Sequence, residues 1–238
     1  MWDTLLDDLA LLSLDAGDTI VYFDARAAAS EATREGFRLD AEVIDATLGS
    51  AKRALDAGAL DLLALDDPAI PAKWGAFMRW LVARGGEPEP ARSADCVRAL
   101  WRAHQRFNLW RRVPDGLADG LRALRASGLR VVVVSNSEGR LAELFARLGL
   151  SDAFDRVLDS HIEGVEKPDP RIFQRALGEV APSAALHLGD VYSTDVVGAR
   201  AAGMRALLLD PRGEYAAAHA DVPTVPDALT VVRALLRR

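Results

Sequence analysis

Residues 9–20 read Leu-Ala-Leu-Leu-Ser-Leu-Asp-Ala-Gly-Asp-Thr-Ile, and this stretch decides the fold. An apolar run long enough for a buried strand stops at Asp15, and Asp18 follows after Gly17, a residue that lets the backbone turn sharply. A carboxylate at the carboxyl end of a buried parallel strand lies at the crevice where open α/β sheets bind ligands. A plain Asp-Gly turn after a strand has the same pattern, so the choice between the two depends on the rest of the chain.

The length and composition suit one large α/β domain or a domain with a substantial insert. The chain has 238 residues, 50% of them hydrophobic, and can bury a sizeable core. No apolar run reaches the roughly 18 residues that a membrane-spanning helix needs. Asp3, Asp7 and Asp8 precede the first apolar run, which argues against a signal peptide. A single cysteine, Cys96, excludes an intrachain disulfide and a thiolate metal cluster, and we predict a cytoplasmic protein without membrane attachment.

The charge pattern argues against a nucleic-acid partner. The formal net charge is −6, and the pairs Arg111-Arg112 and Arg237-Arg238 are too short to make a basic patch. The chain strongly prefers arginine, because only three of its 29 basic residues are lysines: Lys52, Lys73 and Lys167. Where such a chain uses lysine, the choice indicates a need for a compact point charge. The sequence supports no prediction of oligomeric state.

Residues 25–112 form a helical module between the first strand and the rest of the chain. Ala/Leu-rich segments with charges at helical spacing predict helices over Ala27–Phe37, Ala41–Ala57, Pro71–Arg84 and Ser93–Asn108. The module also carries a group of large aromatic residues: Trp74, Phe77, Trp80, Trp101, Phe107 and Trp110. We interpret this group as the core of a small helical bundle rather than a ligand cage.

From Val113 onward the pattern alternates between helix and strand. The unbroken run of valines at 131–134 suits a parallel strand buried on both faces. Further strands are predicted at 156–158, 185–188 and 206–209, with helices between them. This alternation predicts a Rossmann-like α/β core, a parallel sheet with helices on both faces. We therefore expect a core of residues 1–24 and 113–238 and an inserted all-helical domain of residues 25–112.

Two later segments place polar groups next to predicted strands and helices. The valine run ends in Ser135-Asn136-Ser137, where a hydroxyl and the N–H groups that open a helix can hold an anion. An ordinary helix N-cap has the same residue types. Glu166-Lys167-Pro168-Asp169-Pro170 places a lysine in a proline-stiffened loop directly before a helix. A solvated loop lysine is the alternative there.

Another strand ends in Leu188-Gly189-Asp190, with Asp195 five residues beyond Asp190. Asp195 alone could simply complement the dipole of the following helix. Together with Asp15, the two aspartates would form a carboxylate cluster suited to Mg²⁺, which takes one or two carboxylates and meets substrate phosphate. His187, in the same predicted strand, is interpreted as a packed strand residue.

These features, in this order, resemble the haloacid dehalogenase-like (HAD) hydrolase superfamily. Four short runs carry the resemblance: Asp15-x-x-Asp18-Thr19, Val134-Ser135-Asn136, Lys167-Pro168-Asp169-Pro170-x-Ile172-Phe173, and Gly189-Asp190-Val191-Tyr192 continuing to Asp195. Each run alone is weak, but four in order with matching secondary structure are specific. The resemblance covers nearly the whole chain, because the helical module is similar to the inserted helical cap of that superfamily.

The resemblance implies a catalytic group and a metal site. Asp15 would be the nucleophile that attacks phosphorus and forms an aspartyl-phosphate. The metal would be Mg²⁺, held by Asp15, the carbonyl of Gly17 and Asp190, with Asp195 supporting it directly or through water.

It also implies a binding site for a small phosphorylated substrate. Ser135 would hydrogen-bond the transferring phosphoryl group, and Lys167 would neutralise charge at the nucleophile and the phosphate. Asn136 would join these two residues in binding the substrate. These roles are coherent, because phosphoryl transfer depends mostly on positioning and on stabilising charge at the equatorial oxygens.

The chain departs from the superfamily pattern at Gly17. Phosphatases of the superfamily usually carry there a second aspartate, which protonates the leaving oxygen and then activates water. Such a general acid–base group contributes about 10²–10⁴-fold in rate. Asp18 comes one position later, and we consider it both as a replacement acid and as a structural hydrogen-bonding residue.

The departure leaves several functions open. We expect a Mg²⁺-dependent phosphatase of weak or atypical activity. The alternatives are a non-catalytic or regulatory protein that binds metal and phosphate on the same fold, and a 2-haloacid dehalogenase, for which a metal-free site would be expected. A phosphosugar mutase is disfavoured because it needs a proton shuttle at position 17. Phosphonate cleavage needs a cap lysine, and nothing marks Lys52 or Lys73 for that role.

Overall fold

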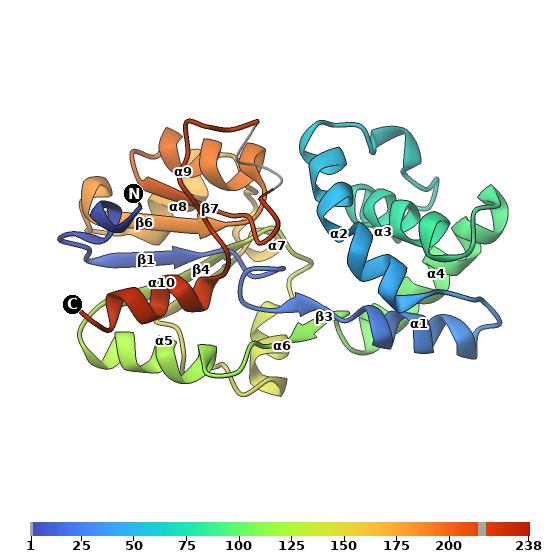
Figure 1. The fold of residues 1–238 in the computed structure, drawn as a ribbon, viewed down its shortest axis with the longest axis horizontal. Helices are drawn as coiled ribbons and strands as arrows, with labels where there is room; N and C mark the ends of the chain where they lie inside the picture. Colours follow the sequence, from blue (N-terminus) through green and yellow to red (C-terminus); the bar gives the residue numbers. More distant parts are fainter. Residues whose placement is uncertain (1, 214–217) are drawn as a thin grey trace. The chain divides into compact units, whose positions relative to one another are not determined.

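The computed structural model describes residues 2–213 and 218–238. The chain forms two compact units, one made of Met1–Tyr22 with Arg111–Arg238 and the other of Phe23–Trp110. The first is an α/β unit and the second is helical (Figure 1). Among the helices of the described residues, none has the length and apolar character needed to cross a bilayer.

A parallel sheet forms the centre of the α/β unit. Within the described residues its strands lie in the order β5-β4-β1-β6-β7-β8, and each neighbouring pair is parallel. Their bounds are β1 Leu11–Leu14, β4 Arg130–Ser135, β5 Arg156–Asp159, β6 Ala185–Gly189, β7 Arg205–Leu209 and β8 Thr224–Val225. The chain builds outward from β1 through β4 to β5, and then returns to the other side of β1 with β6. The order therefore switches at β1, the position where open α/β sheets form a ligand crevice.

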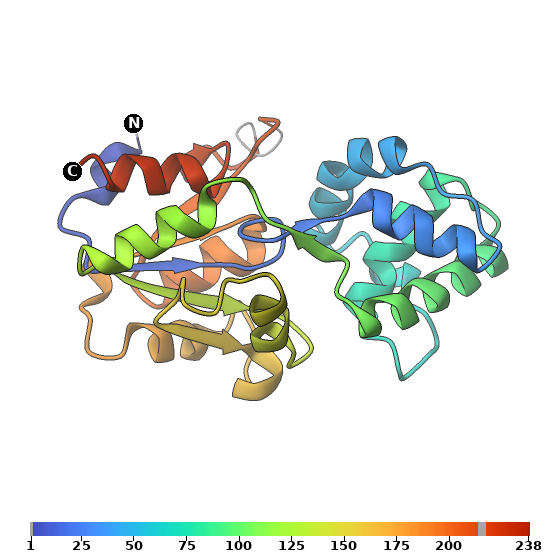
Figure 2. The same cartoon turned by 90° about the horizontal axis from the view of Figure 1, so that it is seen from below.

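Helices cover both faces of this sheet, as the alternating sequence pattern predicts. On one face α5 (Leu117–Ala126) packs against α10 (Ala228–Leu235), and on the other α8 (Pro170–Leu177) packs against α9 (Val197–Ala201) (Figures 1 and 2). The remaining helical segments of this unit are α6 Leu141–Arg147, α7 Ser160–Glu163, two 3₁₀ turns at Asp3–Leu6 and Pro182–Ala184, and a π-helix at Tyr192–Val196. The predicted Rossmann-like α/β fold is confirmed.

The central strands form because their apolar runs have no exposed face. All four residues of β1 are buried, and the valines at 131–134 of β4 are fully buried. Such strands are stable only between two covered faces, which is why they occupy the middle of a parallel sheet. The four strands expected after the helical module are all present, at β4, β5, β6 and β7.

The helical unit contains α1 Ala25–Arg34, α2 Ala41–Asp56, α3 Ala72–Gly85 and α4 Pro90–Arg106, within three residues of the predicted bounds. Carboxylates cap three of these helices: Asp24 begins α1, Asp40 begins α2 and Glu89 begins α4. Each accepts a hydrogen bond from an N–H group of the first turn, where the helix has no internal acceptor. A short pairing of β2 (Tyr22–Phe23) with β3 (Trp110–Arg112) was not predicted, since neither strand is long enough to show a period.

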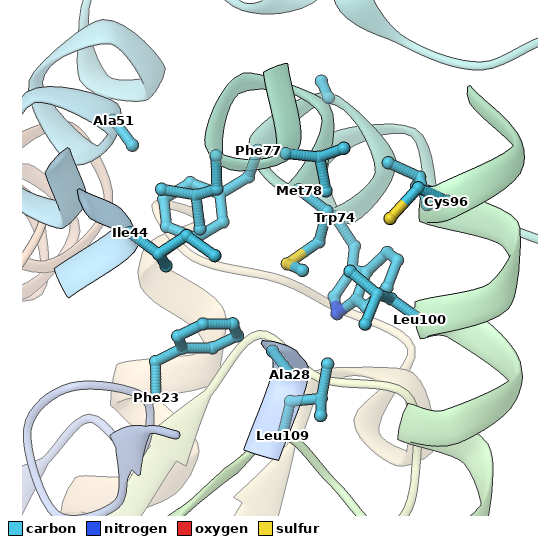
Figure 3. Close-up of a cluster of buried hydrophobic side chains, with 14 of the residues drawn as sticks. Phe23, Ala28, Ile44, Ala51, Trp74, Phe77, Met78, Cys96, Leu100 and Leu109 are labelled. Carbon is cyan, nitrogen blue, oxygen red and sulfur yellow. The ribbon is translucent and has the colours of Figure 1, made fainter. Parts of the chain in front are cut away.

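The aromatic group forms the core of the helical unit, as predicted. Trp74 and Phe77 are buried beside Ile44, Met78 and Leu100 (Figure 3). Partly buried tryptophans complete the cluster: Trp80, Trp101 and Trp110. The rings of Trp74 and Trp101 meet edge to face with centroids 4.8 Å apart, a favourable aromatic arrangement. Phe107 is the exception among the predicted aromatic residues, because it is not part of this cluster.

Candidate active site

Three polar residues lie at the carboxyl ends of neighbouring strands, which together form the carboxyl edge of the sheet. Asp15 follows β1, Ser135 is the last residue of β4, and Asp190 follows β6. The N–H of Asp15 donates to the carbonyl oxygen of Leu188 at 2.9 Å, so β1 stays paired with β6 up to this residue. All three are nearly buried, with Ser135 exposed by 4% and each aspartate by 7%. The fold thus gathers polar groups from distant parts of the chain at the predicted edge.

Lys167 joins this edge from the loop before α8. Its ammonium donates to Oδ1 of Asp15 and to Oδ1 of Asp195, both at 2.5 Å, and the residue is 1% exposed. A fully buried lysine is rare unless carboxylates pair with it. The alternative of a solvated loop lysine is therefore wrong, because Lys167 is the buried cation between two carboxylates.

Charge pairing keeps this lysine protonated. Burial acts to lower the pKa of Lys167, but Asp15 and Asp195 outweigh it, so the pKa lies above its ordinary value. Burial raises the pKa of Asp15; the charge of Lys167 opposes this rise and that of Asp195 adds to it. The pKa of Asp195 lies well below its ordinary value, since Lys167 and His187 outweigh the effect of burial. The site therefore holds an ammonium, a firmly ionised Asp195 and a carboxyl at Asp15 whose charge depends on the lysine.

Asp195 makes hydrogen bonds with both of its carboxylate oxygens. Its Oδ1 accepts from Lys167 and lies 3.2 Å from Nε2 of His187, and its Oδ2 accepts from the N–H groups of Asp190 at 3.1 Å and Val191 at 2.9 Å. These four contacts use both oxygens for protein donors. In this structure Asp195 therefore holds the lysine and the turn after β6, and its predicted part in the metal site stays a prediction.

Asn136 makes two hydrogen bonds with the backbone of Lys167. Its Nδ2 donates to the carbonyl oxygen of Lys167 at 2.9 Å, and its Oδ1 accepts from the N–H of Lys167 at 2.7 Å. The side-chain amide thus holds the backbone of Lys167 from both sides, next to the cis Lys167–Pro168 peptide bond. Asn136 therefore positions the backbone of Lys167, because its amide pairs with a backbone peptide group, and its predicted role in substrate binding stays a prediction.

The loop after β1 corrects the expectation for Gly17. Asp18 has a φ of +52°, whereas Gly17 is not among the glycines with positive φ. The N–H of Asp18 donates to the carbonyl oxygen of Val21 at 2.7 Å, which closes the turn. Aspartate tolerates the left-handed conformation better than most residues, so the left-handed position of this turn is Asp18 rather than Gly17. Asp18 is 8% exposed, and its predicted role as a replacement acid stays a prediction.

A buried pairing of Ser13 and His187 was not predicted from the sequence. The Oγ atom of Ser13 lies 2.8 Å from Nδ1 of His187, whose Nε2 faces Asp195. Both residues are fully buried inside strands. The available signal was the presence of a polar residue within each of two apolar runs, Leu11–Leu14 and Ala185–Leu188.

The donor chemistry at this edge fits a hard cation. Among the described residues, no group of three or more His, Cys, Asp or Glu side chains is arranged as a metal site. Asp15 and Asp190 place two carboxylates at the ends of the adjacent strands β1 and β6. Mg²⁺ commonly takes one or two carboxylates and completes its shell with water and substrate phosphate. This set of oxygen donors therefore suits Mg²⁺ bound together with a substrate.

Two buried hydroxyl groups lie in the loops that follow β1 and β4. Within the described part of the chain, Oγ1 of Thr19 and Oγ of Ser137 have no hydrogen-bond partner. An unpaired buried hydroxyl costs free energy unless a water or ligand satisfies it. Their place in the two loops that carry Asp15 and Ser135 agrees with a polar ligand at this edge.

Gly189 permits the close approach of Asp195, and we predict that Gly189→Ala impairs both stability and catalysis. A Cβ atom at this position would lie 2.2 Å from Cγ of Asp195, so the carboxylate must move. We expect a loss of about 1–3 kcal/mol in the free energy of unfolding, as for overpacked cores, with lower activity. Urea denaturation and steady-state kinetics test this.

The matched control for this substitution is Gly75→Ala in α3. There the nearest atom to an added Cβ is a side-chain methyl of Ile70 at 3.2 Å, and alanine is the better helix former. Equal effects of the two substitutions would contradict the role given to Gly189.

Comparison with known proteins agrees with the site. The family profile described as haloacid dehalogenase-like hydrolase matches residues 9–203. The human haloacid dehalogenase-like hydrolase domain-containing protein 3 is 48% identical over 99 residues, covering 41% of this chain and 39% of that protein. A phosphoserine phosphatase of Thermus thermophilus is 37% identical over 145 residues, covering 60% of this chain and 56% of that protein. The chain thus spans about half or less of the length of these relatives.

Solved structures share the fold at low sequence identity. The HAD hydrolase YfnB of Bacillus subtilis, bound to magnesium, has a TM-score of 0.62 at 19% identity, covering 95% of this chain and 98% of its own. The L-2-haloacid dehalogenase of Xanthobacter autotrophicus has a TM-score of 0.58 at 22% identity, covering 96% and 98%. The family match extends over more than half of the chain and includes Asp15, Ser135, Lys167, Asp190 and Asp195. This chain belongs to the haloacid dehalogenase-like hydrolase family.

Proposed function

We propose that the protein is a Mg²⁺-dependent phosphatase that acts on a small phosphorylated metabolite through an aspartyl-phosphate at Asp15. The observation that carries this proposal is the buried ammonium of Lys167, 2.5 Å from Oδ1 of Asp15 at the carboxyl edge of the sheet. A cation in this place neutralises a carboxylate and an incoming phosphate at the same time. Similarity to the phosphoserine phosphatase of Thermus thermophilus and to a ribulose-1,5-bisphosphate 5-phosphatase of Halopiger xanaduensis supports the reaction class.

The residues of the chain divide the work of phosphoryl transfer. Asp15 attacks phosphorus, and the leaving oxygen departs with the electrons of its bond to phosphorus. Ser135 donates a hydrogen bond to a phosphoryl oxygen, and Lys167 balances the negative charge that collects at the reacting centre. Water then hydrolyses the aspartyl-phosphate, which releases phosphate and restores the carboxylate.

Asp15, the carbonyl of Gly17 and Asp190 would hold the metal. The support is their chemistry, two carboxylates and a carbonyl at one sheet edge, which are the ligands that a hard cation prefers. Bound Mg²⁺ would neutralise charge on the phosphate during transfer. Asp195, occupied by Lys167 and by backbone N–H groups, would act one step away from the metal.

A phosphate assay with and without metal tests the proposal. The purified protein is incubated with a panel of phosphorylated metabolites in Mg²⁺ or in EDTA, and released phosphate is measured beside halide release from 2-haloacids. We expect phosphate release that requires Mg²⁺. Binding of Mg²⁺ and phosphate without turnover would replace the proposal with a regulatory binding protein. Halide release without metal would identify a dehalogenase.

The glycine at position 17 predicts a preference for good leaving groups. Without a general acid, which supplies about 10²–10⁴-fold, alkyl phosphates should react far more slowly than acyl or aryl phosphates. Gly17→Asp should raise turnover of an alkyl phosphate by at least about 10-fold, because it places a carboxyl group where phosphatases of this family usually carry their general acid. The measurement is kcat for glycerol phosphate, p-nitrophenyl phosphate and acetyl phosphate.

Gly17→Asn is the matched control, since it adds the same bulk without a titratable proton. Equal rates for alkyl and acyl phosphates in the unmodified protein, with a normal burst of aspartyl-phosphate, would contradict this preference. Loss of the preference in Gly17→Asn as well would show that bulk, not acid, is responsible.

The helical unit is proposed to select the substrate, as a cap inserted in the sequence between Asp15 and Ser135. The support is that residues 23–110 form a compact unit with an apolar core of its own. We also propose a cytoplasmic location, on the basis of the single, buried Cys96. Transfer of the helical unit from a relative with a known substrate tests the first of these proposals through a change in substrate preference.

A further inference from the structure

Two polar residues lie inside an otherwise apolar layer of the sheet. Ser13 of β1 and His187 of β6 are direct neighbours in the strand register, and both are fully buried. The layer around them contains Leu11, Val132 and Phe173 among other apolar side chains. Polar groups in such a layer stabilise the fold less than well-packed apolar residues of similar volume, even when they are hydrogen-bonded. Their presence therefore calls for an explanation other than stability.

The hydrogen bonds of His187 define its protonation. Burial lowers the pKa of His187 despite the nearby Asp195, so the ring is neutral. The ionised Asp195 can only accept, so Nε2 of His187 carries the proton and donates to Oδ1 of Asp195 at 3.2 Å. The hydroxyl of Ser13 then donates to Nδ1 at 2.8 Å. Every polar side-chain atom of Ser13 and His187 therefore has a partner. Ser13 donates to His187, and His187 donates to Asp195.

The ring plane of His187 is set by packing as well. The ring of Phe173 meets it edge to face, with centroids 4.9 Å apart and an interplanar angle of 85°. Ser13 holds one ring nitrogen, and Phe173 of α8 packs against the ring. The Nε2–H group is therefore aimed at Asp195 by two independent contacts.

The two carboxylate oxygens of Asp195 have different partners. Its Oδ2 is held by the backbone N–H groups after β6, and its Oδ1 is shared by His187 and Lys167. Without His187, Lys167 would be the remaining donor to Oδ1 of Asp195. The carboxylate could then change its position together with the ammonium group. With His187 in place, Oδ1 is a fixed point from which the ammonium reaches Asp15.

We propose that His187, oriented by Ser13, is a positioning residue for the nucleophile of this enzyme. A chain of hydrogen bonds runs from Ser13 through His187, Asp195 and Lys167 to Asp15. It begins and ends on the same segment, because Asp15 is two residues after Ser13. It therefore locates the ammonium relative to the strand that carries the nucleophile. Misplacement of a reacting group by about 1 Å can cost 10²-fold in rate, which gives a reason for two polar residues in this apolar layer. The inference rests on the proposed function of Asp15 and Lys167.

Kinetics of His187→Leu, His187→Gln and Ser13→Ala test this inference. His187→Leu fits the apolar layer and removes the donor, so we expect a loss of about 10–100-fold in kcat, as for supporting residues of other sites, with little change in KM. Its free energy of unfolding should equal or exceed that of the unmodified protein. His187→Gln keeps an N–H donor and should recover most of kcat. Ser13→Ala should show a smaller loss, because the ring keeps its contact with Phe173.

Leu186→Val is the matched control, a core substitution one position earlier in β6 with its side chain on the opposite face of the sheet. It should lower stability and leave kcat unchanged. A folded His187→Leu protein with kcat within twofold of the unmodified protein would overturn the inference. Equal losses of kcat in His187→Gln and His187→Leu would also overturn the inference, because the N–H donor at this position would then make no contribution to kcat.

A spectroscopic readout separates this inference from the proposed function. In protein labelled with ¹⁵N-histidine, the ring N–H of His187 should give a slowly exchanging signal, assigned by its loss in His187→Leu. We expect this signal to shift in Lys167→Met, which shares Oδ1 of Asp195 with the ring. Absence of phosphatase activity with this coupled signal present would refute the proposed function alone. A signal that is missing, or that does not respond to Lys167→Met, would overturn the inference.

Discussion

Replacement of Asp15 by asparagine should abolish phosphate release. The amide cannot act as the nucleophile and cannot form the aspartyl-phosphate, so we expect a loss on the order of 10⁴–10⁶-fold in kcat, the range seen when a nucleophile is removed. The substitution keeps the shape of the side chain next to Lys167, which donates to Oδ1 of the aspartate. Steady-state release of phosphate and mass spectrometry of acid-quenched protein, which detects the covalent intermediate, measure both parts of this prediction.

Asp119→Asn provides the matched control for this prediction. It makes the same chemical change in α5, where the side chain is 87% exposed and pairs with Arg122. A surface ion pair of this kind contributes about 0–1 kcal/mol, so neither stability nor activity should change much. Phosphatase activity that survives Asp15→Asn would refute the assignment of the nucleophile and, with it, the proposed reaction.

Replacement of Lys167 by methionine should damage both catalysis and stability. The change leaves the carboxylates of Asp15 and Asp195 buried without their cation, and breaking a buried ion pair costs about 3–5 kcal/mol. Turnover should fall by at least about 10²–10³-fold, the usual effect of removing one stabilising group at a reacting centre. The measurements are urea denaturation in EDTA and steady-state kinetics in Mg²⁺.

The stability loss in Lys167→Met should depend on pH. In the unmodified protein the pKa of Asp195 is lowered in the folded state, so its stabilising effect is present above the unfolded pKa and is lost as pH falls through the folded pKa. Without the lysine, burial raises the pKa of Asp15 further above its ordinary value, and the pKa of Asp195 rises because the largest lowering contribution is gone. The variant then loses stability as pH rises through that range, so the difference between the two proteins should shrink from pH 7.5 to pH 5.

Lys73→Met in α3 is the matched control, because Lys73 is exposed and the substitution should change stability by about 0.5 kcal/mol or less. A difference between Lys167→Met and the unmodified protein that is the same at both pH values would contradict the paired-charge description of the site.

The sequence predicted most of the fold because its signals were local. The valine run at 131–134 and the apolar run ending at Leu14 each require burial on both faces, and alternation with helices leaves a parallel sheet as the arrangement that supplies it. Aromatic residues in the helical module had nowhere to be buried except against one another. The short pairing of β2 and β3 escaped prediction, because two or three residues carry no measurable period.

For the candidate site, the sequence predicted which residues come together but not how they contact one another. Its main members, Asp15, Ser135, Lys167 and Asp190, follow from polar residues at the ends of predicted strands and helices, because such ends meet at one edge of a parallel sheet. The sequence also indicated the special place of Lys167, one of three lysines in a chain that strongly prefers arginine. These inferences need only the order of the elements.

The contacts of each side chain were decided by the tertiary structure alone. Asn136 holds the backbone of Lys167, Asp195 accepts from four protein donors, and His187 joins Ser13 to Asp195. A hydrogen bond depends on distances of a few tenths of an ångström between groups far apart in the chain, and no local pattern encodes those distances. By itself, therefore, the sequence determined which elements form and which polar residues share an edge. The tertiary packing determined which of those residues hold one another in place, because it alone brings Ser13, His187, Asp195 and Lys167 within hydrogen-bond distance.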